Sequence, residues 1–132
     1  MALTGQRIDW RQLREFAATR LDGSFVVEWR LDGETLLIDV DLQLDPEHPF
    51  YEKPRPAEKV CIRPAVIEFP WLESLAVDGG EAGGDAAGKV AGLRAGAIEN
   101  LWRMHEGPYV LQGAFGNVEI DAERPILRLR EA

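Results

Sequence analysis

Apolar and polar residues alternate in steps of two over much of the chain, most clearly in residues 24–31 and 36–44. Successive side chains of a β-strand point to opposite faces of a sheet, so this period predicts strands with one buried face and one wet face. The inward-facing set is expected to be Phe25, Val27, Trp29, Leu31, Leu36, Ile38, Val40, Leu42 and Leu44.

A tight turn separates these two runs. Asp32 and Gly33 form a dipeptide that is typical of two-residue hairpin loops, because the turn needs backbone conformations that these residues tolerate. The loop would place Trp29 opposite Leu36 and would bring both apolar sets to the same face. A slip of one residue would destroy that agreement.

The last third of the chain repeats the alternation in residues 98–104, 109–115 and 118–122, with a final short run at 126–130. Turn residues between the runs indicate an antiparallel meander. Here the inward-facing set is expected to be Ile98, Trp102, Met104, Tyr109, Leu111, Phe115, Val118, Ile120 and Ala122.

Another strand is expected at residues 60–69, where Pro64 interrupts the apolar run. Proline has no N–H to donate to a sheet ladder. The sequence therefore predicts that this strand lies at an edge of the sheet or carries a bulge near Pro64.

Residues 9–21 follow a helical period instead. Apolar residues recur there at spacings of three and four, at Trp10, Leu13, Phe16, Ala17 and Leu21. Asp9 precedes the run and Gln12 follows three residues later, which is the pattern of a capping box. The segment is predicted to be an N-terminal helix.

These elements predict an α+β fold that is mainly β, with an N-terminal helix followed by about seven antiparallel strands in a meander-rich curved sheet, a sandwich or a partly open barrel. The length of 132 residues suits a single globular domain, residues 1–132. Two irregular segments are expected within it, a Pro-rich loop at 45–59 and a flexible Gly/Ala-rich loop at 78–92.

The net charge of the chain limits the classes of partner that it can bind. With 15 Lys and Arg against 23 Asp and Glu, the formal net charge is -8 at pH 7, which opposes binding to nucleic acid and to anionic membranes. No apolar run approaches the roughly 18 residues of a membrane-spanning helix, and the N-terminus lacks the pattern of a signal peptide. The composition predicts a cytoplasmic protein without nucleic-acid or membrane partners.

Few residues could support catalysis. The chain holds two histidines, His48 and His105, and one cysteine, Cys61. This inventory excludes a three-histidine zinc site and the paired cysteines of a zinc ribbon. A mixed site of His48, His105, Cys61 and carboxylates stays open, but histidines in or beside loops are ordinarily solvated, so no metal or cofactor is expected. An enzyme would have to use His48, Cys61 or His105, although a cysteine between Val60 and Ile62 is typical of a small buried side chain.

Acidic residues line one side of the predicted front hairpin. Glu28, Asp39, Asp41 and Asp45 lie on the parity opposite the core. Carboxylates at two-residue steps along a strand stand about 7 Å apart, so they form a row rather than a converging pair. The row is typical of a solvated face and would also suit a basic protein partner.

The Pro-rich loop is the second candidate surface. Aromatic and arginine side chains contribute strongly at recognition surfaces, and the loop with its flanks offers His48, Phe50, Tyr51, Arg55, Arg63 and Trp71. Two interpretations are open. Phe50 and Tyr51 could close an open end of the sheet, or the segment could form one wall of a groove for a protein segment or a small anion.

The succession of amphipathic strands resembles several bacterial β-rich proteins, including toxin-immunity proteins, and no diagnostic motif covers the chain. The first hypothesis is a non-enzymatic protein-binding module, of immunity type, that recognises a basic partner. The alternatives are a small-molecule carrier with an apolar β-sheet interior and an enzyme that uses the histidines or the cysteine. A homodimer through the strand at Pro64 also stays open.

Overall fold

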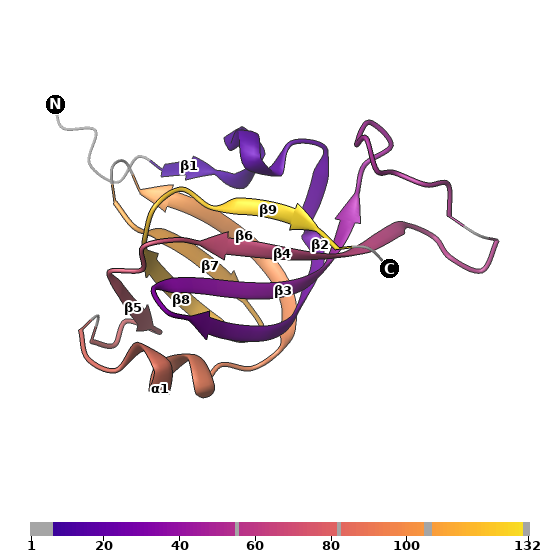
Figure 1. The fold of residues 1–132 in the computed structure, drawn as a ribbon. Helices are drawn as coiled ribbons and strands as arrows, with labels where there is room; N and C mark the ends of the chain where they lie inside the picture. The colour runs from indigo at the N-terminus through magenta and orange to yellow at the C-terminus, as the bar shows by residue number, and fades with distance from the viewer. Residues whose placement is uncertain (1–6, 55, 82, 105–106, 131–132) are drawn as a thin grey trace, which may run out of the picture.

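The computed structural model describes residues 7–54, 56–81, 83–104 and 107–130. This part of the chain forms nine antiparallel strands in one sheet that does not close, in the order β5-β8-β7-β6-β2-β3-β4-β9, with β1 paired to β6. Figure 1 shows the strands curving around a common interior. The strands are β1 (Arg7–Asp9), β2 (Thr19–Asp32), β3 (Thr35–Leu44), β4 (Cys61–Phe69), β5 (Ser74–Val77), β6 (Gly96–Met104), β7 (Tyr109–Gly113), β8 (Gly116–Asp121) and β9 (Ile126–Leu129). The mainly β prediction is confirmed, and β1 and β5 are strands that the sequence pattern did not predict.

The predicted N-terminal helix is wrong. In its place are two 3₁₀ turns, η1 (Trp10–Gln12) and η2 (Arg14–Phe16), separated by Leu13 in an extended conformation. The buried side chains of this segment are spaced by three residues, which fits the 3.0-residue turn of a 3₁₀ helix better than an α-helical face. Leu21, which the helical pattern also included, belongs to β2.

The front hairpin turns one residue later than predicted. β2 and β3 are joined by Gly33 and Glu34, which puts Trp29 opposite Ile38. Gly33 has a φ of +61°, a conformation that glycine adopts without strain in a hairpin loop.

A β-bulge at Val27 in β2 reverses the faces that the sequence pattern predicted for the residues before it. The register shifts between Val26 and Glu28, so Val26 is 0% exposed, whereas Phe25 is 45% and Val27 is 48% exposed. An extra residue in one strand breaks the alternation, so the residues before it face the side opposite to the one that counting back from Trp29 predicts. The inward placement predicted for Phe25 and Val27 is therefore wrong.

A register shift between Ile98 and Asn100 reverses the expected faces of the residues that follow it in β6. It places Leu101 opposite Leu111 in the core. Trp102 then lies opposite Val110 on the outer face, where it is partly exposed, although the sequence pattern predicted an inward side chain.

Pro64 lies inside the sheet rather than at an edge. β4 pairs with β3 on one side, without a register shift, and with β9 on the other. The Pro64 carbonyl oxygen accepts a hydrogen bond from the Arg130 nitrogen at 2.8 Å, so the backbone of Pro64 faces the β9 side. The missing N–H of Pro64 therefore costs no hydrogen bond to β3. Strand β9 pairs with β4 only as far as Ala65, so it ends beside Pro64.

The Gly/Ala-rich segment at 78–92 contains a short helix that the sequence pattern did not predict, α1 (Ala86–Ala91). Val90 anchors it in the core. The Lys89 ammonium donates hydrogen bonds to three carbonyl oxygens, those of Leu75 at 2.8 Å, Glu81 at 2.6 Å and Gly83 at 2.5 Å. Because Leu75 lies in the edge strand β5, the lysine covers part of an open sheet edge. The flexibility of this segment stays a prediction.

The inward side chains of the strands pack into one cluster with η1, η2 and α1. Aromatic pairs fix it at two places: Trp29 meets Phe115 edge to face at 5.1 Å between ring centroids, and Phe69 meets Tyr109 at 5.3 Å. In the part of the chain that the structure describes, no helix is long and apolar enough to cross a membrane.

Candidate functional site

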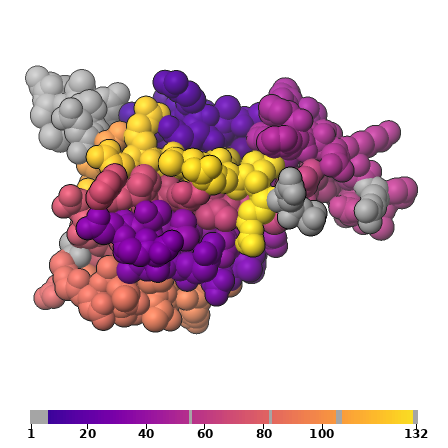
Figure 2. All heavy atoms as spheres, in the orientation of Figure 1, coloured from indigo at the N-terminus to yellow at the C-terminus, as the bar shows by residue number. Residues whose placement is uncertain are grey.

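The Pro-rich loop extends away from the sheet between β3 and β4 (Figures 1 and 2). Its described residues form turns and irregular backbone rather than a helix or strand. Local hydrogen bonds shape its first part, from the His48 nitrogen to the Asp45 oxygen at 2.9 Å and from the Tyr51 nitrogen to the His48 oxygen at 3.0 Å. The loop therefore turns locally, and the missing donors of its prolines agree with the lack of strand pairing among its described residues.

Glu52 ties the loop to the start of β4. Its backbone nitrogen donates to the Cys61 sulfur at 3.5 Å, and its carboxylate accepts from Arg63 at 2.9 Å. Arg63 also donates to the Phe50 oxygen at 3.3 Å. Cys61 is buried, so this thiol is part of the packing at the base of the loop. Glu52, Cys61 and Arg63 border a cavity of about 250 Å³.

The aromatic residues of the loop have different environments. Tyr51 packs against the core, as expected for a side chain that closes the end of the sheet. Phe50 is exposed, and its ring lies 5.8 Å from the ring of His48. His48 is half-buried; its Nδ1 accepts from the Phe50 nitrogen at 3.0 Å, and burial lowers its pKa.

Trp71 does not join this group. It lies two residues after Phe69, the last residue of β4, whereas Arg63 lies near the first, and the six residue steps from Arg63 to Phe69 span roughly 20 Å. The groove imagined from Tyr51, Arg63 and Trp71 is therefore not assembled. Arg55 and His105 lie outside the described residues, so their predicted roles stay predictions.

The predicted acidic face carries an internal ion-pair network. Asp39 is buried on the outer side of β3, where it accepts from Arg30 Nε at 2.8 Å and Arg30 Nη2 at 2.7 Å, with Arg130 Nη1 3.6 Å away. The hydrogen bonds from Arg30 hold the pKa of Asp39 below its usual value, against the opposing effect of burial. Glu68 and Arg128 form a further pair beside it. We call Arg30, Asp39, Glu68, Arg128 and Arg130 the ion-paired end.

The other end of the same outer face is apolar. Asp41 is exposed there and stands between Phe25 of β2 and Pro64 of β4. On the same side of β4 as Pro64, Ile62 is exposed, and Val60 leads from it into the Pro-rich loop. Figure 2 shows β3, β4 and β9 as successive bands on this face, with the loop beyond them. We call Phe25, Val27, Val60 and Ile62 the apolar end.

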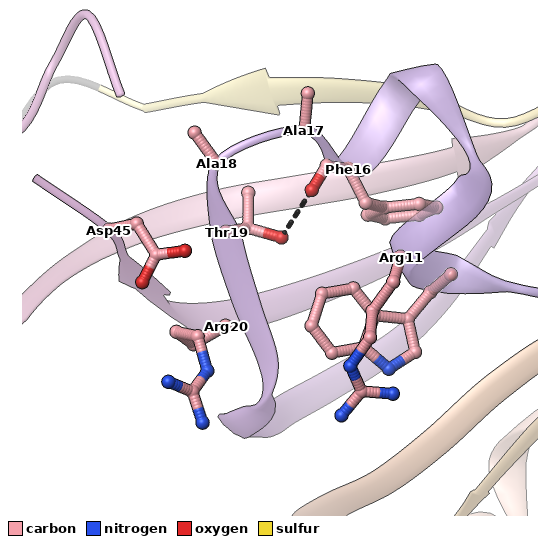
Figure 3. A pocket seen from close by; sticks show the side chains of 8 residues that line it. Arg11, Phe16, Ala17, Ala18, Thr19, Arg20 and Asp45 are labelled. Carbon is pink, nitrogen blue, oxygen red and sulfur yellow. Dashed lines mark hydrogen bonds between the residues drawn. The ribbon is translucent and has the colours of Figure 1, made fainter. Parts of the chain in front are cut away.

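Asp45 lies apart from the other predicted acidic residues. It lines a cavity of about 330 Å³ with Trp10, Arg11, Phe16, Ala18 and Arg20, beneath the two 3₁₀ turns. Figure 3 shows these side chains around the cavity, with Thr19 donating to the Phe16 oxygen at 2.8 Å. The Asp45 nitrogen donates to the Ala18 oxygen at 2.9 Å, which fixes the start of the Pro-rich loop against the start of β2.

The sequence pattern gave no indication of this cavity, because it treated residues 9–21 as one helix. The predicted cap is nevertheless present: Asp9 Oδ1 accepts from the Arg11 nitrogen at 3.1 Å, and Gln12 Oε1 accepts from the Asp9 nitrogen at 3.1 Å. The cap orients Arg11, which stacks over Trp10 at 4.4 Å from its ring centroid.

A further surface cavity of about 370 Å³ lies on the outer face of β6, β7 and β8 and is bordered by Trp102, Met104, Val110 and Glu119. It exists because the shift in β6 turns Trp102 outward, a feature for which the alternation held no signal. Arg7 covers part of the indole, at 4.4 Å from the ring centroid.

The described residues offer little for catalysis. His48 and Cys61 each accept a backbone hydrogen bond within the loop, and none of the hydrogen bonds found in the described part joins them. No group of three or more His, Cys, Asp and Glu in the described ranges could hold a metal ion. Comparison with known proteins adds no analogy, since no family model, curated protein or solved structure matches this chain.

Proposed function

We propose that this protein is a non-enzymatic binding module that docks another protein on the apolar end and the adjoining Pro-rich loop. The supporting observation is the distribution of exposed hydrophobic side chains. Of the seven large ones in the described part, five lie here: Phe25, Val27, Phe50, Val60 and Ile62. A concentration of exposed apolar side chains on a soluble protein is typical of an interaction site.

The charge of the chain favours a basic partner over a second copy. At a formal net charge of -8, two copies repel each other, whereas a cationic protein is attracted. Glu28 and Asp41 border the apolar end as exposed carboxylates. The partner we propose therefore presents apolar side chains flanked by Lys or Arg, which includes the immunity-type case of an acidic protein that covers a basic surface.

Neither alternative gains a supporting observation. A carrier needs an apolar interior cavity, but the inward-facing side chains pack into one core cluster, and each cavity described above is bordered by exposed residues. An enzyme needs converging polar groups, and His48 and Cys61 are each engaged in packing the loop.

The proposal is tested by capture from lysate of the native host with three forms of the protein. We expect Ile62→Ser to lose a partner that wild type and Ile126→Ser both retain. Ile126 is the matched control because it is 41% exposed, against 40% for Ile62, and lies on β9 away from the apolar end. The captured protein is then purified and titrated at low and high salt.

Two results would contradict the proposal. If Ile62→Ser and Phe25→Ser bind as tightly as Ile126→Ser, the apolar end is not the docking surface. If binding is unchanged between low and high salt, charge attraction plays no part. Thermal unfolding of each variant shows whether a loss of binding reflects a loss of fold.

A further inference from the structure

The cavity beneath the two 3₁₀ turns has a charge arrangement that its own side chains leave incomplete. Asp45 lines it, and the Asp45 carboxylate makes no hydrogen bond or ion pair with any described residue. Arg20 lines it as well and contacts Asp22 through Nε alone, at 3.3 Å. The two terminal nitrogens of Arg20 have no partner among the described residues. An uncommitted carboxylate and an uncommitted guanidinium therefore border one cavity without pairing to each other.

Arg11 has a different role at the same cavity. Its two terminal nitrogens are engaged by Asp9 at 3.0 Å and Asp22 at 3.2 Å. The Asp22 carboxylate therefore contacts both arginines at once, Arg11 through Oδ2 and Arg20 through Oδ1. The terminal nitrogens of the planar Arg20 guanidinium remain open to a ligand. Arg11 therefore adds positive charge beside the cavity, but its terminal nitrogens are already engaged by Asp9 and Asp22.

The remaining lining is apolar or unsatisfied. Ala17 and Ala18 provide apolar contact above the buried ring of Phe16, and Trp10 carries an indole N–H that has no hydrogen-bond partner within the described residues. Ala18 has a φ of +58°, a left-handed conformation that costs a non-glycine residue about 1 kcal/mol. The hydrogen bond to the Asp45 nitrogen helps to hold this conformation, so the two walls of the cavity are fixed to each other.

We propose that this cavity binds a small zwitterion of the α-amino acid class. The ligand carboxylate lies against the terminal nitrogens of Arg20, the ligand ammonium lies against Asp45, and the side chain of the ligand contacts Ala17 and Ala18. A simple anion would satisfy Arg20 and be repelled by Asp45, and a simple cation would meet the reverse problem. A zwitterion satisfies both groups, and a cavity of about 330 Å³ is at the lower end of the range for small-molecule sites.

The test compares leucine with its two half-molecules. 4-Methylpentanoate keeps the carboxylate and side chain without the ammonium, and isoamylamine keeps the ammonium and side chain without the carboxylate. Titrations of the full chain are followed by amide chemical shifts and by calorimetry. We expect saturable shifts at Ala18, Thr19 and Asp45 with leucine, and roughly tenfold or weaker affinity for each half-molecule, because each loses one charge-assisted contact.

Two variants and two matched controls assign the contacts. Arg20→Gln and Asp45→Asn should each weaken leucine binding by about tenfold or more, while Arg14→Gln and Asp32→Asn, exposed changes of the same kind outside the cavity, should leave it unchanged. Asp45→Asn is expected to fold normally because its carboxylate has no partner to lose. The proposal is overturned if no α-amino acid gives a saturable shift at these amides, if the half-molecules bind as well as leucine, or if both folded variants bind like the controls.

Discussion

The ion-paired end and the apolar end share the outer face of β2, β3 and β4 but differ in how their side chains are satisfied. At the ion-paired end, Asp39 is buried under Arg30 and Arg130, so its charge is balanced within the chain. At the apolar end, Phe25, Val27 and Ile62 remain exposed without a covering element. The comparison teaches that the acidic row of the sequence is partly structural, whereas its apolar neighbours are exposed and form the surface that we propose for a partner.

The largest effect should come from the bulge that creates the apolar end. Val26→Asp places a carboxylate in the core and is expected to cost at least about 3 kcal/mol of unfolding free energy, because a buried unpaired charge is strongly disfavoured. Val27→Asp, one residue later, should change stability by no more than about 0.5 kcal/mol. Urea unfolding of both variants measures the difference. A larger cost for Val27→Asp than for Val26→Asp would mean that β2 has no bulge at this point.

The same bulge marks the limit of prediction from sequence for this fold. Alternation located β2, β3, β4, β6, β7, β8 and β9, since the period of two depends only on neighbouring residues. It failed to assign the faces of residues before the shift at Val27 and after the shift at Glu99, because an inserted residue leaves the local pattern intact while reversing the face. The helical period of residues 9–21 failed for a related reason, as a spacing of three fits a 3₁₀ turn as well.

Candidate surfaces were predictable only in part. The Pro-rich loop was identified because proline acts locally on its own backbone. The ion pairs of Asp39 could not be predicted from the sequence, because Arg30 lies across the hairpin and Arg130 reaches Asp39 only after β9 pairs with β4. The cavity at Asp45 and Arg20 also escaped the sequence, since it forms where η1, η2, β2 and the loop meet in space.

The next largest change in stability is expected from a substitution at the ion-paired end. Asp39→Asn leaves Arg30 without its anionic partner and is expected to cost about 1–2 kcal/mol, a range that allows for the partial exposure of Arg30. Asp41→Asn is the matched control on the same strand, with an exposed carboxylate, and should be nearly neutral. If both variants lose the same stability, the network around Asp39 does not distinguish the two ends.

Acid should remove the difference in unfolding free energy between wild type and Asp39→Asn. The folded-state pKa of Asp39 lies below its ordinary value of 3.8 because of Arg30. Its contribution is therefore complete above the unfolded pKa and is lost as the pH falls through the folded one. Unfolding free energies of wild type and Asp39→Asn should converge below pH 3.8 after standing apart at pH 6. A constant gap over that interval would contradict the assignment.

The smallest effect belongs to the loop beside the apolar end and falls in a different pH window. Burial holds the pKa of His48 below 6.5, so the unfolded chain binds the proton more readily and stability should decline as the pH drops below 6.5. In His48→Asn the side-chain oxygen can still accept from the Phe50 nitrogen but does not titrate, so its stability should depend less on pH between 7 and 5. His105 is present in both proteins and cancels in the difference. Parallel curves for the two proteins would show that His48 is not held in its neutral form by the loop.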